Sequence, residues 1–430
     1  MFFTLPESVG THYSPHHPVV RQDKDTTKLR IVYNGSDKPG SQELSLNDCL
    51  ETGPNYIPHL FDMLVRFRSN PIAITADIEK AFLMVGIKNE HKDMLRFLWF
   101  EDPYSVDPST IVLRFNRLMF GLRPSPSILG SVIQHHLDLY KKSESEMAEL
   151  LSRAFYVDDL LTGEKNVAKT FDIYDRAKEI KASGGFNLRK WSSNSKEVMQ
   201  RIERVESKCV GNNANHREDD ESYAKLSTGQ TTTTSDNAVK LLGVRWNIGE
   251  DVLFFDFTEL QDYARLLPVT KRSLLKLVAK IFDPLGLLSP FTITLKILFQ
   301  ELRLDQIGWD QELDGGLRLR IMAIRRQIIH LNAVNILRYY CLSDTNPVTV
   351  ELHGFSDAWK HAYGAVVYFR SVYSDGRVHV VLVAAKTRVA PTKQQSIPRL
   401  ELLGALILSR LTKKLRDIIG EIEATHWIDS

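Results

Sequence analysis

Two adjacent carboxylates inside an apolar stretch are the first residues of this chain whose chemistry stands out. Asp158 and Asp159 lie between the apolar residues 155–157 and 160–161. Neighbouring carboxylates in such a setting repel each other and lose solvation, so the pair is costly unless a cation binds there. Mg²⁺ held by one or two carboxylates together with substrate phosphates is a common arrangement of this kind. A solvated turn between two strands is the alternative, but the apolar flanks favour a metal site.

A third carboxylate, Asp77, is the predicted partner of this pair. Residues 72–76 have the composition of a short buried strand, and Asp77 stands at its end, where a helix-like segment begins. The chain between Asp77 and Asp158 is long enough to fold back and place two strands side by side. Asp77 could instead cap the following helix. Together the three carboxylates would suit the binding of divalent cations.

A second set of three carboxylates lies near the end of the chain. The sequence predicts three successive strands and an amphipathic helix at residues 347–355, 363–368, 377–385 and 394–415. Asp357 follows the first strand, Glu401 lies on the helix, and Asp429 ends a last short strand. Each acid alone could be an ordinary surface residue. Their order resembles that of ribonuclease H, and it would let the three meet around two Mg²⁺ ions.

Basic and glycine residues elsewhere are suited to phosphate contact. Lys28 and Arg30 share one face of a predicted strand that would suit a triphosphate, although a solvated strand is the alternative. Lys190 follows a glycine turn and precedes a tryptophan, which suits contact with a primer strand because cations hold phosphates and aromatic rings stack. Gly121 would let the backbone approach a template or nucleotide closely, and an ordinary loop is the alternative.

The composition is that of a globular protein. The chain has 430 residues, 43% of them hydrophobic and 25% charged, which leaves room for about two to four domains. Because the net charge is only +2, any nucleic-acid site must come from local clustering of basic residues. The three cysteines form neither a zinc spacing nor a disulfide framework. No apolar run approaches the roughly 20 residues that span a bilayer, and no signal peptide is evident, so we expect a soluble intracellular protein.

The motifs around these residues resemble reverse transcriptases, and in particular the Pol polyprotein of BEL/Pao LTR retrotransposons. Tyr-Val-Asp-Asp at 156–159 is similar to the reverse transcriptase hairpin, and the segment at 77–82 is similar to its first carboxylate motif. Phe-Asp-Pro-Leu-Gly at 282–286 and Phe-Ser-Asp-Ala at 355–358 point to the BEL/Pao group. Phe120 departs from the family, which often carries glutamine there. The resemblance covers the chain from about residue 16 onward.

This resemblance implies a fold class and a division of the chain. We expect an α+β protein in which a right-hand polymerase, with fingers, palm and a helical thumb or connection, precedes an incomplete ribonuclease H-like α/β domain. Fingers and palm are expected at 1–260, with an exposed low-complexity loop at about 211–237. The helical thumb or connection is expected at 261–345 and the ribonuclease H-like domain, truncated at its C-terminus, at 346–430.

The resemblance also implies roles for the residues singled out above. Asp77, Asp158 and Asp159 would be catalytic and bind two Mg²⁺ or Mn²⁺ ions. The ring of Phe82 would clash with a ribose 2′-hydroxyl and so favour dNTPs. Nucleotide contacts would come from Lys28, Arg30, Gly121 and Lys190, the last of these assisting the pyrophosphate. Two further metal ions would be bound in the ribonuclease H-like domain by Asp357, Glu401 and Asp429.

The sequence therefore predicts the RNA-directed DNA polymerase of a retrotransposon. Its expected partners are an RNA template, a DNA primer, an RNA/DNA hybrid, dNTPs and other retroelement proteins, with no membrane. Ribonuclease H activity is expected to be weak or absent because that domain is short. The predicted location is the cytoplasm, in retroelement particles, with the nucleus as a second location. The alternative is a catalytically inactive retroelement remnant that at most binds nucleic acid.

Overall fold

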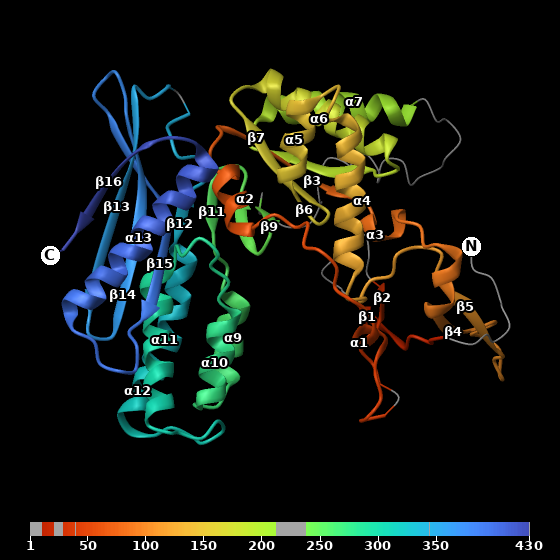
Figure 1. Cartoon of the computed structure of the whole chain (residues 1–430), viewed down its shortest axis with the longest axis horizontal. Coiled ribbons are helices and arrows are strands. Elements are labelled where there is room, and N and C mark those ends of the chain that lie inside the picture. Colours follow the sequence, from red (N-terminus) through yellow and green to blue (C-terminus); the bar gives the residue numbers. More distant parts are fainter. Residues whose placement is uncertain (1–10, 21–28, 39, 212–237, 344, 430) are drawn as a thin grey trace.

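The computed structural model describes residues 11–20, 29–38, 40–211, 238–343 and 345–429. Within these residues the chain is a mixed α+β protein with three four-stranded sheets and two two-stranded ribbons. In Figure 1 the N-terminal half lies on the right and the C-terminal half on the left. Residues 212–237 of the expected low-complexity loop lie outside the described residues, as does Lys28.

The strand β3 (Ile72–Ile78) lies in the middle of a sheet that we call the central sheet, with the strand order β6-β7-β3-β8. All its pairings are antiparallel, and the other strands are β6 (Phe155–Tyr156), β7 (Asp159–Glu164) and β8 (Leu188–Ser193). The apolar run that opens β3 is largely buried, as expected for a short apolar strand covered on both faces. The buried strand predicted at 72–76 is therefore confirmed.

Among the described elements, four helices pack against one face of the central sheet (Figure 1). They are α4 (Ser125–Tyr140), α5 (Ser145–Ala154), α6 (Val167–Ser183) and α7 (Lys196–Gly211). Ile74, Ala76 and Ile78 of β3 share a hydrophobic core with these helices. Because side chains alternate along a strand, Asp77 is directed to the opposite face.

The N-terminal region is built from short elements joined by an aromatic cluster. These elements are β1 (His16–Val20), β2 (Leu29–Tyr33), α1 (Leu46–Cys49), α2 (Leu60–Phe67), α3 (Ala81–Met84), η1 (Asn89–Met94), β4 (Arg96–Phe100) and β5 (Thr110–Arg114). The ribbons β1-β2 and β4-β5 meet through the rings of Tyr33, Phe97 and Phe115, whose centroids lie 4.7 to 5.2 Å apart. This cluster joins the two ribbons to each other.

The middle of the chain contains a small sheet, here called the hairpin sheet, with the order β12-β11-β10-β9. A group of helices lies between β11 and β12 in the sequence. The elements are β9 (Ala238–Leu241), β10 (Val244–Asn247), β11 (Val252–Phe254), α9 (Thr258–Leu266), α10 (Lys271–Lys280), α11 (Ser289–Leu304), α12 (Gly315–Gln327), η2 (Ile328–Ala333) and β12 (Asn335–Leu337). A loop separates α10 from α11, since Pro284 lacks the N–H that a continuous helix needs there.

The loop between α10 and α11 is seated on the C-terminal part of the chain by Gly286. This glycine has a φ of 74°, and a Cβ at its position would lie 1.8 Å from the carbonyl oxygen of Ala385. Any side chain would therefore displace the loop. The backbone N–H of Ala385 donates to the carbonyl of Leu285 at 2.9 Å. The Phe-Asp-Pro-Leu-Gly stretch thus acts as a docking loop.

The C-terminal sheet has the order β15-β14-β13-β16 and carries one long helix on one face (Figure 1). Its elements are β13 (Thr349–Trp359), β14 (Ala362–Val372), β15 (Val378–Val389), α13 (Ile397–Ile419) and β16 (Glu423–Ile428). β13, β14 and β15 are antiparallel neighbours, whereas β16 returns parallel to β13 after the helix. The three strands, the helix and the final strand predicted from the sequence are confirmed.

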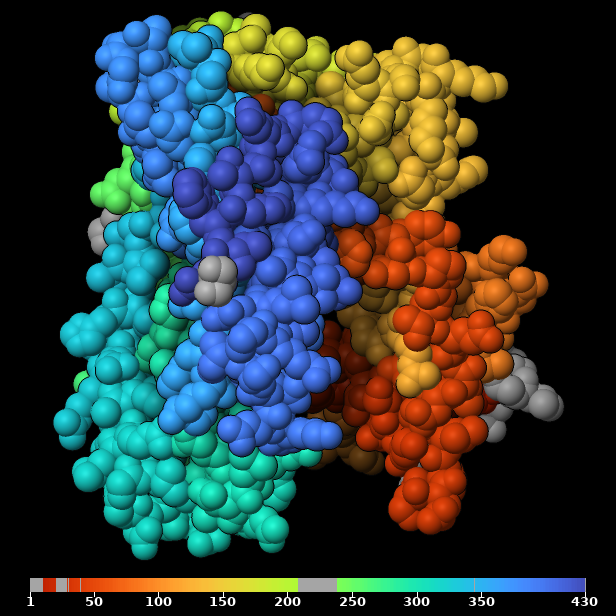
Figure 2. Space-filling view, turned by 60° about the vertical axis from the view of Figure 1, so that its left-hand side comes forward, coloured from red at the N-terminus to blue at the C-terminus, as the bar shows by residue number. Residues whose placement is uncertain are grey.

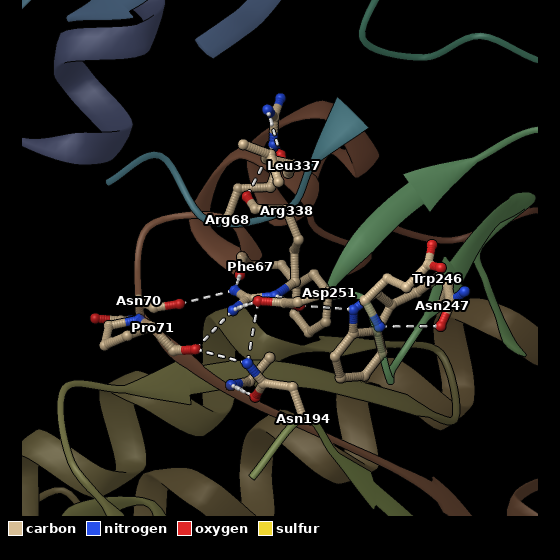
Figure 3. Close-up of polar contacts among 12 residues, drawn as sticks. Phe67, Arg68, Asn70, Pro71, Asn194, Trp246, Asn247, Asp251, Leu337 and Arg338 are labelled. Atoms are coloured by element: carbon tan, nitrogen blue, oxygen red, sulfur yellow. Dashed lines mark hydrogen bonds and ion pairs between the residues drawn. The ribbon is translucent and has the colours of Figure 1, made fainter. Parts of the chain in front are cut away.

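Two fully buried arginines join the two halves of the molecule (Figure 3). Arg338 donates to the carboxylate of Asp251 at 2.6 and 2.8 Å and to carbonyls at the end of α2 and just before β3. Arg68 donates at 2.8 to 3.1 Å to the carbonyl of Arg338 and to carbonyls of β12 and β15. One hydrophobic core accordingly runs from α2 through the hairpin sheet to the C-terminal sheet.

None of the described helices is long and apolar enough to cross a membrane.

Candidate active site

The register of the central sheet places two of the predicted carboxylates opposite each other. Asp77 of β3 pairs with Asp159 of β7, and the backbone N–H of Ile78 donates to the carbonyl of Asp158 at 2.8 Å. Directly opposite side chains of an antiparallel pair have Cβ atoms about 4.5–5.5 Å apart. The strands that carry Asp77 and the Asp158-Asp159 pair therefore lie side by side, as the sequence predicted.

The hairpin between β6 and β7 has a strained backbone. Tyr156 pairs with Asp159, which leaves Val157 and Asp158 as the two residues of the turn. Val157 has a φ of 60°, in the left-handed region that β-branched residues rarely adopt. Such a conformation persists only where the surrounding structure imposes it, and it is typical of functional sites. The strain fixes the position of Asp158 at the tip of the hairpin.

A bulge in β8 brings Lys190 to the carboxylates. Between Thr75 and Asp77 of β3 the facing strand advances by one extra residue, from Ser192 to Arg189. Lys190 lies in this bulge with a φ of 55°. Bulges re-aim side chains, and here the Nζ of Lys190 donates to an Oδ of Asp77 at 2.9 Å.

The pKa of Asp159 reflects the burial and the charges of the site. Burial of this carboxyl, with the charges of Asp158 and Asp77 as further causes, raises its pKa from 3.8 to about 7, against an opposing effect of Lys190. Near neutral pH the carboxyl therefore holds a proton for much of the time. The charges of Asp77 and Asp158 help to keep Asp159 partly protonated. A divalent cation would lower the negative potential of the three carboxylates.

The donor set suits hard cations such as Mg²⁺, which prefer carboxylate oxygens and keep several waters. As the side chains stand, no group of three His, Cys, Asp or Glu residues within the described ranges is arranged to hold a metal ion. Asp77 is engaged by Lys190 instead, so the ammonium group occupies a position where positive charge is favoured. Two metal ions in this site stay a prediction, and Asp77, Asp158 and Asp159 are the residues that would hold them.

Phe82 and Gly121 are linked by Phe120, which precedes Gly121 in the chain and contacts Phe82. The ring of Phe82 contacts that of Phe120 at a centroid distance of 4.8 Å. Gly121 has a φ of 87°, and a Cβ there would lie 2.6 Å from the carbonyl oxygen of Tyr33. Its own carbonyl accepts a hydrogen bond from the amide of Asn47 at 2.9 Å. The glycine is thus required by packing against β2, and its contact with a nucleotide stays a prediction.

The predicted triphosphate face of the N-terminal strand is described only in part. Lys28 lies outside the described residues, and of Arg30 only the backbone is described, in β2 opposite Val19. The strand character predicted for this segment is confirmed from Leu29 to Tyr33.

Two of the three C-terminal acids, Asp357 and Asp429, lie next to each other at one end of the C-terminal sheet. Ser356 of β13 pairs with Ile428 of the parallel strand β16, so the next residues, Asp357 and Asp429, are neighbours. Both line a cavity of about 710 Å³. Glu401 is half-buried on α13, one turn before Gly404, whose Cβ position is 3.4 Å from the carbonyl oxygen of Asp357. Glu401 itself is not among the described residues that line this cavity.

A charged pair beside Asp77 was missed by sequence reasoning. Glu79 accepts hydrogen bonds from Arg189 at 2.8 Å and from the amide of Asn187 at 3.0 Å. The spacing of Asp77 and Glu79 by two residues, and the adjacency of Arg189 and Lys190, would have been the available signals. The consequence of the bulge, that Lys190 and not Arg189 reaches Asp77, has no signal in the sequence.

Comparisons with known proteins agree with this architecture. Residues 270–430 match the family model described as the Pao retrotransposon-like RNaseH-like domain. The whole chain resembles the solved structure of the foamy viral protease-reverse transcriptase in complex with an RNA/DNA hybrid, with a TM-score of 0.53 and 15% identity. That similarity covers 97% of this chain and 45% of the viral one, so the chain spans less than half the length of that protein. Curated protein sequences give no match.

The class that these findings define is an α+β protein with the fold of a retroviral reverse transcriptase and an RNaseH-like domain at its C-terminus. The resemblance to the Pol of BEL/Pao-type retroelements, predicted from the sequence motifs, is thereby confirmed.

Proposed function

We propose that the chain is the RNA-directed DNA polymerase of a retroelement, with the central sheet as its palm. The observation that carries this proposal is the register of β3 and β7, which sets Asp77 opposite Asp159 with Asp158 at the hairpin tip. In this proposal the ribbons β1-β2 and β4-β5 form the fingers, and the helices α9 to α12 form the thumb or connection. The similarity in fold to the foamy viral protease-reverse transcriptase supports the same function.

In this mechanism the chain's own groups orient the substrates. Divalent ions bound by the three carboxylates, Mg²⁺ or Mn²⁺, would supply Lewis-acid activation of the primer hydroxyl and charge neutralisation at the leaving pyrophosphate. Lys190 holds Asp77 in place in the free protein, and its side chain is 42% exposed. It is therefore free to turn to a phosphate oxygen when the carboxylate takes another cation. Asp159, with its pKa near 7, loses its proton when a cation binds beside it.

The ring of Phe82, supported by Phe120, would stand beside the sugar of the incoming nucleotide and select dNTPs. RNA template, DNA primer and their hybrid are the proposed nucleic-acid partners, because the foamy viral protein of the same fold was solved with an RNA/DNA hybrid. At the C-terminal sheet, Asp357, Asp429 and Glu401 form the proposed ribonuclease H-like site.

Incorporation of dTTP on a poly(rA)/oligo(dT) substrate with Mg²⁺ or Mn²⁺ tests this function. The variant Asp158→Asn should lose about a hundredfold or more of the activity, because one of the charged ligands is removed from the site. The matched control is Asp172→Asn, which changes an exposed aspartate of α6 and should keep full activity. Synthesis that survives Asp158→Asn would refute the assignment of the site. A folded wild-type protein that binds the hybrid without synthesis would leave the inactive remnant as the function.

A further inference from the structure

A cavity of about 740 Å³ lies where α11, β15 and α13 meet. The loop that follows α10 closes one side of it, and α2 contributes Phe61. None of the candidate catalytic carboxylates is among its lining residues. Figure 2 shows this side of the molecule, with α13 in blue next to the orange-red α2. Gly286, Ser289, Ala385 and Thr387 also line the neighbouring cavity that holds Asp357 and Asp429, so the two cavities are adjacent.

Positive charge dominates the walls of this cavity. The cations that line it come from three elements and are Lys296, Lys386, Arg388, Arg410 and Lys414. Lys414 forms an ion pair with Asp62 at 2.9 Å. Within the described part of the chain, Lys386, Arg388 and Arg410 form no ion pair and no side-chain hydrogen bond. Like charges gathered without counter-charges repel each other, and an anion relieves this repulsion.

The single carboxylate of the cavity wall, Asp283, does not neutralise these cations. Its two oxygens accept hydrogen bonds from the backbone N–H groups of Leu287 at 2.8 Å and Leu288 at 2.7 Å. Burial raises the pKa of this carboxyl. Asp283 thus serves to shape the docking loop, and the charge of the cavity remains strongly positive.

Apolar side chains also line the cavity, which narrows the class of anion that it could bind. These residues, here called the apolar wall, are Phe61, Tyr363, Leu403, Leu406 and Ile407. The last three share helix α13 with Arg410 and Lys414, and Leu406 is 43% exposed. A ligand with a phosphate group and a planar apolar part would satisfy both the cations and the apolar wall. Cavities of about 300–1,000 Å³ are of the size that small-molecule sites have, so a nucleotide fits and a duplex does not.

A neighbouring depression extends the basic surface beyond the cavity. It shares Arg410 and Lys414 with the cavity and adds the cations Arg66 and Lys413, together with the carboxylates of Asp62 and Asp417. A chain of phosphates could therefore leave the cavity along this side of α13.

We propose that this cavity binds the phosphate group and base of a single nucleotide unit, either a free nucleotide or one unit of a single-stranded polynucleotide. Lys386, Arg388 and Arg410 contact the phosphate, and the apolar wall contacts the base. This site is additional to the proposed polymerase site and does not depend on it, because it shares no residue with the central sheet. The binding experiment below distinguishes a free nucleotide from a nucleotide unit of a strand.

Binding of three probes to the full chain tests the proposal: dTTP, inorganic triphosphate and fluorescein-labelled single-stranded oligo(dT). Affinities are measured by calorimetry or fluorescence anisotropy with EDTA at about 50 and 200 mM salt, because phosphate contacts weaken with salt. EDTA suppresses nucleotide binding that needs a metal at the three carboxylates. The variant Arg388→Gln/Arg410→Gln should weaken binding about tenfold or more, with a smaller dependence on salt.

The matched control is Lys165→Gln/Lys169→Gln, which removes the same charge from exposed positions near the start of α6 and should change the affinity less than about twofold. Loss of dTTP and triphosphate binding in the cavity variant supports a free nucleotide, and loss of oligo(dT) binding alone supports a strand. Absence of binding by all three probes, or equal weakening by both double variants, overturns the proposal. If the cavity variant unfolds, as judged by its melting curve, Lys386→Gln replaces it with the same expectation and a smaller effect. The polymerase assay with Asp158→Asn is independent of all these outcomes.

Discussion

The raised pKa of Asp159 makes a quantitative prediction about stability in the absence of metal. In the folded protein the pKa of this carboxyl is about 7, against 3.8 when it is unperturbed. A folded-state pKa that lies above the unfolded one means that the folded protein binds the extra proton. The contribution of this carboxyl to stability is therefore largest below about pH 4, falls as the pH rises towards 7, and stays level above that. Replacing the carboxyl in Asp159→Asn removes this loss.

The size of the effect follows from the shift. Each pH unit between the two pKa values costs about 1.4 kcal/mol, so roughly 2 kcal/mol would be lost between about pH 5 and pH 7. Water reaches part of this side chain, and the three carboxylates titrate together, so we expect a loss of about 1–2 kcal/mol. The free energy of unfolding of Asp159→Asn should thus exceed that of the wild type by about 1–2 kcal/mol more at about pH 8 than at about pH 5.

Urea unfolding with EDTA, followed by tryptophan fluorescence, measures this difference. Trp191 is fully buried in the core beneath the central sheet and follows Lys190 directly, so its fluorescence reports on this region. Asp172→Asn is the control, since it changes an exposed carboxylate of α6 and should give no pH-dependent difference. Millimolar Mg²⁺ should reduce the difference at high pH if the carboxylates bind it. Parallel pH profiles of wild type and Asp159→Asn in EDTA would refute the electrostatic reasoning.

Three further predictions concern the core of the molecule. Arg338→Met should lower the free energy of unfolding by about 3–5 kcal/mol in urea, because it leaves several buried carbonyls without their donor and removes the cation paired with the carboxylate of Asp251. Gly286→Ala should cost about 1–3 kcal/mol and speed proteolysis of the docking loop, since its Cβ would lie 1.8 Å from a carbonyl oxygen. Lys181 is fully buried over the ring of Phe155, and burial lowers its pKa from 10.5 to about 7. Its folded-state pKa lies below the unfolded one, so stability rises with pH between about 7 and 10, and Lys181→Met should be more stable by about 2 kcal/mol near pH 6, with a smaller difference near pH 9.

Matched variants separate these effects from general damage. Arg265→Met breaks an exposed ion pair with Asp262 and should cost less than about 0.5 kcal/mol. Gly376→Ala changes a glycine of similar φ with open space around it, so it should cost less than Gly286→Ala. A wild type more stable than Lys181→Met at every pH would show that the contact with Phe155 outweighs the burial of the amine.

Local patterns in the sequence predicted much of the architecture. Some features are encoded over a few neighbouring residues: the apolar run of residues 72–76, the carboxylates at 158–159 and the proline-marked break after α10. Strand burial, turn chemistry and helix interruption all act over that range. The strands and helix that carry Asp357 and Glu401 follow from the same short-range periodicities. The catalytic roles of these acids and the expected position of Glu401 beside Asp357 stay predictions, whereas the neighbouring positions of Asp357 and Asp429 agree with the predicted order of the strands.

Only the tertiary structure decided how these elements are coupled. The contact of Lys190 with Asp77 depends on a one-residue bulge in β8, and a register shift of this kind depends on the pairing of two distant strands and on no local pattern. Likewise, Arg68 and Arg338 are ordinary surface residue types in sequence, yet both are buried because carbonyls from distant segments converge on them. The basic cavity also gathers cations from three separate elements. Each of these features arises from packing between segments far apart in the chain, and packing of this kind leaves no periodic trace in the sequence.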